Sequence, residues 1–161
     1  MKEFILGYVK YNYWANERIV QVLKNNPEAL DKELVSSFKT IRGTIYHLWD
    51  AETIWYKRIE GESLQIWPSE SFLGTEDDFF KSFLEQSGKF ISLVENMPGE
   101  KFSHSISYTN TKGIAFKTYV SDIILHAMNH STFHRGQIIS MMRNTGITTL
   151  PSTDYIAFIK R

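Results

Sequence analysis

The sequence contains no cysteine, which excludes disulfides, zinc sites built from thiolates and a cysteine nucleophile. Lys and Arg together number 18, as do Asp and Glu, so no excess charge attracts nucleic acid or an anionic membrane, and we expect neither as a partner. No apolar run is long enough to span a bilayer. The first residues, MKEF, carry an acid early and lack a long apolar region, so we expect no signal peptide. Together these absences predict a cytoplasmic globular protein.

Four stretches carry apolar residues at three- and four-residue steps, the period of an amphipathic helix. The 161 residues suffice for one domain with a substantial core, so we predict a single domain over 1–161. Ser36 or Ser37 is the expected N-cap of the second helix and Thr118 that of the fourth. The predicted helices cover residues 3–25, 38–60, 76–97 and 118–144.

Residues 102–116 change the pattern, because they alternate with period two around a turn-like stretch at 109–113. This favours a short hairpin or an extended crossover loop. Residues 149–158 are expected to add a short final turn of helix. The sequence therefore predicts an all-α fold, a four-helix bundle with one long non-helical crossover connection before the last long helix.

Two polar residues fall on apolar stripes. Asn12 lies on the stripe of the first helix, where a buried amide needs hydrogen-bond partners. Its hydrogen bonds either stabilise the core or support the ligands of a nearby site. Glu52 lies on the stripe of the second helix, and a buried carboxylate is costly unless it is paired. Glu52 and the tyrosines are the candidates for residues that contact and orient the ligands of a site without being ligands themselves.

Three of the five histidines, His126, His130 and His134, lie four residues apart in the last predicted helix. Residues at this spacing lie one above another on a helix surface. The apolar face of this helix has His134 near its centre, His130 closer to its edge and His126 on the flank. His47 lies beside the apolar stripe of the second helix and can face inward as well.

These histidines admit two readings: hydrogen-bonded core residues, or ligands of a metal ion. Three imidazoles around Zn²⁺, Ni²⁺ or Fe²⁺ leave coordination positions open, as in catalytic sites. Such an ion lowers the pKa of bound water, or binds and ionises a thiol. In that case His126 is a weaker candidate for a ligand, or it donates a hydrogen bond that orients one of the ligands. His104, among serines, is expected to face solvent.

Other catalytic patterns are missing from the sequence. It contains no Glu-x-x-His pair, His-Glu-x-x-His, P-loop, dinucleotide fingerprint or Gly-x-Ser-x-Gly elbow. Its motifs do resemble those of the DinB (damage-inducible) family. The resemblance rests on residues 11–18 (YNYWANER), 44–52 (TIYHLWDAE) and 126–138 (HAMNHSTFHRGQI), and on Gly146 followed by Pro151 and Asp154.

The resemblance implies a four-helix bundle, often dimeric, in which His47, His130 and His134 hold a divalent metal ion. Related members of the superfamily use low-molecular-weight thiols such as bacillithiol or mycothiol as cosubstrates. We therefore expect a metal-dependent enzyme, a thiol S-transferase or a hydrolase, that is a homodimer and acts on a small molecule. The alternative is a non-catalytic metal-binding stress-response bundle that acts through a protein partner.

Overall fold

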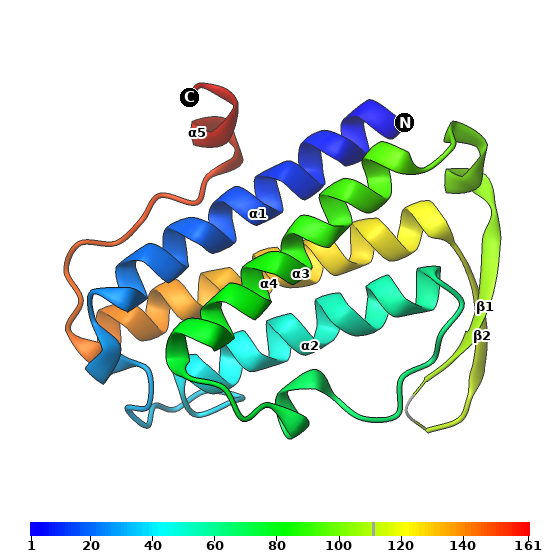
Figure 1. Cartoon of the computed structure of the whole chain (residues 1–161). Coiled ribbons are helices and arrows are strands. Elements are labelled where there is room, and N and C mark those ends of the chain that lie inside the picture. The colour runs from blue at the N-terminus through cyan, green and yellow to red at the C-terminus, as the bar shows by residue number, and fades with distance from the viewer. Residues whose placement is uncertain (111) are drawn as a thin grey trace.

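The computed structural model describes residues 1–110 and 112–161, and most of them lie in helices. Four long helices lie side by side, with a two-stranded hairpin at one end of them (Figure 1). The prediction of an all-α four-helix bundle is confirmed. The elements are α1 (Lys2–Lys24), α2 (Ile41–Ile59), α3 (Glu76–Asn96), β1 (Ser105–Thr109), β2 (Ala115–Tyr119), α4 (Val120–Thr145) and α5 (Tyr155–Ile159), with 3-10 turns at Pro27–Ala29, Pro68–Ser71 and Gly99–Ser103.

The helices α1 and α2 lie diagonally opposite each other in the bundle, because each of them packs against both α3 and α4. Along the bundle α1 and α4 run in one direction, and α2 and α3 run in the other (Figure 1). Since α2 and α3 are parallel neighbours, residues 60–75 must return along the length of the bundle between them. The antiparallel hairpin of β1 and β2 joins α3 to α4 at one end. Thr111, in the predicted turn, lies outside the described residues.

The ends of the helices show where local sequence signals hold and where they fail. Thr75 forms a capping box with Asp78 at the start of α3, and Gly146 ends α4 with φ of 100°. For α2, the side chain of Thr40 is the cap, accepting from the amide of Gly43, so neither predicted serine is used. Thr118 does not cap α4 because it pairs with Ile106 in the hairpin, and the strand continues directly into the helix.

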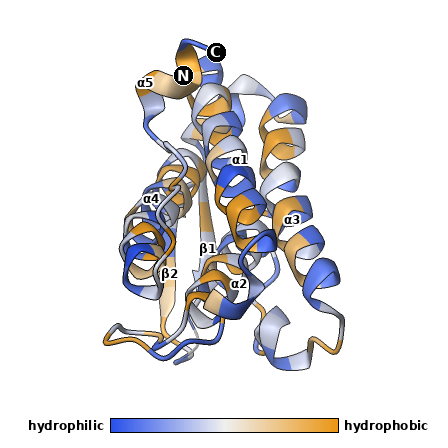
Figure 2. Ribbon diagram, turned by 90° about the vertical axis from the view of Figure 1, so that its left-hand side faces the viewer, coloured by the Kyte–Doolittle hydropathy of each residue, from blue (hydrophilic) through white to orange (hydrophobic). Residues whose placement is uncertain are grey.

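The apolar sides of the helices face one another across the bundle, and polar residues face outward (Figure 2). Two apolar clusters fill the interior, one around Phe79, Phe80 and Phe83 and the other around Phe90 and Phe102. Each of these side chains is at most 1% exposed, so each has lost nearly all of its contact with water. No helix in the described part of the chain is both long and apolar enough to cross a membrane.

A buried polar network lies among the four long helices. The carboxylate of Glu52, only 1% exposed, accepts hydrogen bonds from the amides of Asn12 (2.8 Å) and Asn16 (3.2 Å). It also accepts from the hydroxyls of Ser87 on α3 (2.7 Å) and Ser131 on α4 (3.0 Å). Burial raises the pKa of Glu52, although the bonds from Asn12, Ser87 and Ser131 and the charge of Arg135 act in the opposite direction.

The same two asparagines connect this carboxylate to a buried cation, Arg135, which is 2% exposed. Arg135 donates to the side-chain oxygens of Asn12 and of Asn16, the latter at 3.0 Å, and to the hydroxyl of Thr132 at 2.8 Å. The two amides therefore connect the carboxylate of Glu52 to the guanidinium of Arg135, which do not contact each other directly. Asn12 has the structural hydrogen bonds that its position on an apolar stripe requires.

We expect Glu52→Gln to destabilise the protein by about 3 kcal/mol, because it removes the anion that balances buried Arg135 and places a donor amide against donor amides. Urea unfolding would measure this loss of unfolding free energy. Glu85→Gln is the control, since Glu85 forms an exposed pair with Lys81 at 3.9 Å, and its loss should cost about 0.5 kcal/mol or less. Equal effects of the two substitutions would show that the network does not stabilise the fold.

Candidate metal centre

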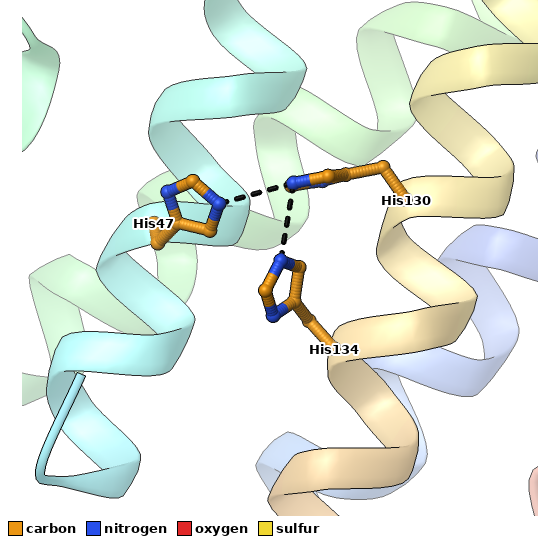
Figure 3. Close-up of side chains that lie close together, drawn as sticks. All are labelled: His47, His130 and His134. Carbon is orange, nitrogen blue, oxygen red and sulfur yellow. Dashed lines mark hydrogen bonds between the residues drawn. The ribbon is translucent and has the colours of Figure 1, made fainter. Parts of the chain in front are cut away.

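Three histidines from two helices meet in the structure (Figure 3). His47 comes from α2, and His130 and His134 come from successive turns of α4, its antiparallel neighbour. The Nε2 atom of His130 lies 3.0 Å from Nε2 of His47 and 3.1 Å from Nε2 of His134. Each histidine offers one nitrogen, and the three lie within 4.8 Å of one another. Sequence phase and the family resemblance indicated the same three residues.

Hydrogen bonding between the rings does not account for this arrangement. The Nε2 atom of His130 has either one proton or one lone pair, yet it faces two other ring nitrogens. Its other nitrogen, Nδ1, is buried and has no hydrogen-bond partner among the residues that the structure describes. Metal–nitrogen bonds of about 2.0–2.1 Å place neighbouring ligand nitrogens roughly 2.9–3.4 Å apart. The two pairs that include His130 have such distances, 3.0 and 3.1 Å, and all three nitrogens lie within 4.8 Å. The donor set therefore fits a divalent metal ion.

Neighbouring side chains orient the rings. The side-chain oxygen of Gln137 lies 2.7 Å from Nδ1 of His134. Because an amide oxygen only accepts, this Nδ1 carries the proton and Nε2 keeps its lone pair for a metal. Phe38, in the connector before α2, stacks on His47 with ring centroids 4.3 Å apart and meets the edge of His134 at 5.7 Å.

The protein environment keeps these imidazoles neutral. Burial, together with the neighbouring His134, lowers the pKa of His47 to about 4. Burial and the other histidines lower the pKa of His130 to about 4 as well. Burial also lowers the pKa of His134, although its bond to Gln137 acts in the opposite direction. Since only a neutral imidazole binds a metal, the cluster is ready to bind at neutral pH without first losing protons.

A hollow of about 330 Å³ opens beside His47. Phe38, Tyr46 and Trp67 supply aromatic surface to its lining, and Asp50 supplies a carboxylate. Asp50 accepts from the amide (2.9 Å) and the hydroxyl (2.5 Å) of Ser69, so it anchors residues 60–75 against α2. Sequence reasoning missed Phe38 and Trp67 as lining residues. Trp67 lies in a connector without a periodic pattern, and the predicted second helix includes Phe38 although α2 begins only at Ile41.

The remaining sequence candidates lie apart from the cluster. His126 is exposed, its ring lies 6.1 Å from that of His130, and it packs against Trp55 at 4.8 Å. His104 is exposed in the segment before β1, as predicted. The carboxylate of Glu52 is occupied by the buried network. Among the described residues, the group able to hold a metal consists of His47, His130 and His134 alone.

Comparison with known proteins agrees with the motifs. The family model for the DinB family matches residues 1–161. The chain belongs to the DinB family. It is 29% identical over 161 residues to the protein DinB of Bacillus subtilis (strain 168), an alignment that covers 96% of this chain and 93% of that protein. The match spans all four helices, and therefore both helices that carry the histidine cluster.

The lowered pKa values predict that the metal-free protein loses stability in acid. In the unfolded chain His47 and His130 take up protons near the ordinary value of 6.5, but in the folded protein only near 4. Proton uptake therefore favours the unfolded state as the pH falls through this interval. Above the interval the two histidines are neutral in both states and no stability is lost. Urea unfolding in chelator across the interval measures the loss.

A His47→Gln/His130→Gln double variant should lose much of this pH dependence, whereas the His104→Gln control should keep it. An unchanged dependence in the double variant would contradict the assignment of the lowered pKa values to these two histidines.

Proposed function

We propose that this protein is a metal-dependent enzyme of the transferase type, in which His47, His130 and His134 hold a divalent ion, Zn²⁺, Ni²⁺ or Fe²⁺. The observation that carries the proposal is the convergence of three imidazole nitrogens within 4.8 Å beside an aromatic-lined hollow. A divalent ion held by three neutral imidazoles keeps coordination positions open and lowers the pKa of a thiol or water that binds there.

The residues around the cluster suit a small organic substrate. Phe38 covers one side of His47, and the hollow next to it offers the faces of Tyr46 and Trp67. Aromatic walls with a few polar groups are typical of small-molecule sites, and they exclude water from a reacting nucleophile. A structural ion would be enclosed by a complete shell of ligands instead.

The nucleophile in this proposal is the sulfur of a low-molecular-weight thiol, with water as the second possibility. In the transfer, sulfur forms a bond to a carbon of the electrophile, the leaving group departs with its electron pair, and the thiol proton passes to solvent. The chain contains no cysteine, so the thiol must enter as a cosubstrate. We propose that the protein acts on a small molecule in this way and that it is a homodimer.

Metal analysis tests the ligand set. We expect wild-type protein loaded with Zn²⁺ and dialysed to retain one ion per chain, and His130→Ala/His134→Ala to retain almost none, because one imidazole cannot hold the ion alone. His126→Ala is the matched control, since His126 lies on the same helix outside the cluster, and it should retain the ion. Stoichiometric metal in the double variant would refute the proposed ligands.

Thiol binding and transfer test the chemistry. Cobalt-loaded protein should gain a sulfur-to-metal absorption band when a small thiol is added, and metal-loaded protein should speed transfer of that thiol to chlorodinitrobenzene with release of chloride. Trp67→Ala should weaken the transfer while the metal stays bound. A bound metal with no activity on any electrophile or hydrolysable substrate would favour the non-catalytic metal-binding bundle that acts through a protein partner.

A further inference from the structure

The hollow beside His47 has a negatively charged lining. Asp50, from α2, and Glu70, from the 3-10 turn Pro68–Ser71, both line it, whereas no Lys or Arg of the described residues does. In the part of the chain that the structure describes, no ion pair joins either carboxylate to a basic side chain. Asp50 is only 6% exposed, so water contributes little to balancing its charge. The hollow therefore lacks a positive charge.

The two carboxylates act on each other. Burial raises the pKa of Asp50, the hydrogen bonds from Ser69 act in the opposite direction, and the charge of Glu70 raises it further. The bonds from Ser69 stabilise the carboxylate of Asp50, but a neutral donor does not balance its charge. A cation in the hollow would lie near both carboxylates and relieve their repulsion.

Three aromatic side chains complete the lining: Phe38, Tyr46 and Trp67. The other three tryptophans of the chain each pack against an aromatic ring. Trp67 forms no such pair within the described residues, and no guanidinium lies over its ring there. Aromatic faces attract cations, tryptophan most strongly, and rings grouped around an ammonium group are a known recognition site for it. The lining thus combines two features that favour an organic cation.

The backbone brings two of these rings to the hollow. Phe38 lies in a tight turn in which Lys39 has φ of 59°, the one positive φ of a non-glycine residue in the described part of the chain. A Cβ at Gly43 would lie 2.8 Å from the main-chain oxygen of Phe38, so only glycine lets this turn lie so close to α2. Trp67 directly precedes the 3-10 turn that Asp50 anchors. A strained turn and an anchored turn that meet at one hollow are typical of a binding site.

We propose that this hollow is an aromatic cage that binds an organic ammonium group. Phe38, Tyr46 and Trp67 form its walls, and Asp50 and Glu70 supply the negative charge. Its volume of about 330 Å³ suits a small compound.

His47 lines the same hollow, so the ammonium compound would be the electrophile that receives the thiol. This assignment as a substrate rests on the proposed function, whereas binding of the cation does not.

Choline and its uncharged carbon analogue test the cage. The analogue, dimethylbutanol, has a tert-butyl group in place of trimethylammonium, so the two compounds share their shape and differ in charge. Each is titrated into protein incubated with Zn²⁺ while the broadening of its methyl signal is followed by NMR. Wild-type protein should bind choline about tenfold tighter or more, because ring faces and carboxylates act on the cation alone. Equal binding of the two compounds would overturn the proposal.

Two variants should lose the preference for choline. Trp67→Leu keeps apolar surface but removes the ring face, and Asp50→Asn removes the buried charge, so each should reduce the preference severalfold. Ser69→Ala removes one bond to Asp50 but keeps its charge, and it should keep the preference. Trp14→Leu is the matched control, since Trp14 is a half-buried tryptophan on α1 outside the hollow. A preference that survives both Trp67→Leu and Asp50→Asn would overturn the proposal.

The ratio of the two affinities separates binding of a cation from other roles of Asp50. If Asp50 only anchored residues 60–75, Asp50→Asn would weaken both compounds alike. If it only balanced the charge of a metal ion, the variant would retain less Zn²⁺ at an unchanged ratio. Either result would overturn its assignment to the cage. Glu70→Gln replaces Asp50→Asn if that variant does not fold, because Glu70 is exposed, and it should lower the preference as well.

Bromocholine and its carbon analogue test whether the bound cation is the substrate. With either bromide, the sulfur of a small thiol forms a bond to the carbon that carries bromine, bromide leaves with its electron pair, and the thiol proton passes to solvent. Metal-loaded protein should use bromocholine with a kcat/KM about tenfold higher, after subtraction of the uncatalysed reaction, and Trp67→Leu should remove this difference.

The two sets of measurements distinguish failure of the cage from failure of the proposed function. Preferential binding of choline without transfer to either bromide would refute the proposed function and support the cage. Transfer to both bromides with equal kcat/KM would support the proposed function and overturn the assignment of the cation as substrate.

Discussion

The balance of buried charge between Glu52 and Arg135 is the constraint on which the rest of this structure depends. Both groups are almost fully covered, and neither could remain charged in an apolar core without compensation. Asn12 and Asn16 provide it, because each amide bonds the carboxylate through nitrogen and the guanidinium through oxygen. The bonds reach all four long helices, so they define how each helix is rotated about its axis.

The geometry of the histidine cluster follows from that rotation. Arg135 is the residue after His134, so the network that holds Arg135 inside the bundle also turns His134 and His130 toward α2. On α2, Glu52 belongs to the network and His47 lies five positions before it, so both helices are oriented by the same set of bonds. The rings then meet with nitrogens 3.0–3.1 Å apart. Stability of the core and geometry of the site are therefore consequences of one set of contacts.

The positions of the helices and the inward-facing histidines could be predicted from the periodicity of the sequence. The apolar stripes located the four helices to within a few residues, since a helix must bury one face, and phase ordered the α4 histidines correctly: His134 is buried and His126 exposed. The predicted caps of α2 and α4 were wrong. Thr40 caps α2 in place of Ser36 or Ser37, and Thr118 belongs to β2 and so does not cap α4. The choice among such candidates depends on small differences in local geometry that a residue pattern does not contain.

The sequence by itself determined the bundle, the absence of thiol chemistry from its own side chains and the three histidines able to meet, because these depend on composition and on the period of a helix. Only the tertiary structure decided the partners. It paired Glu52 with amides and hydroxyls, and it brought Phe38 and Trp67 from connectors to the side of His47. These contacts join residues distant in the chain, and their geometry depends on how whole helices pack.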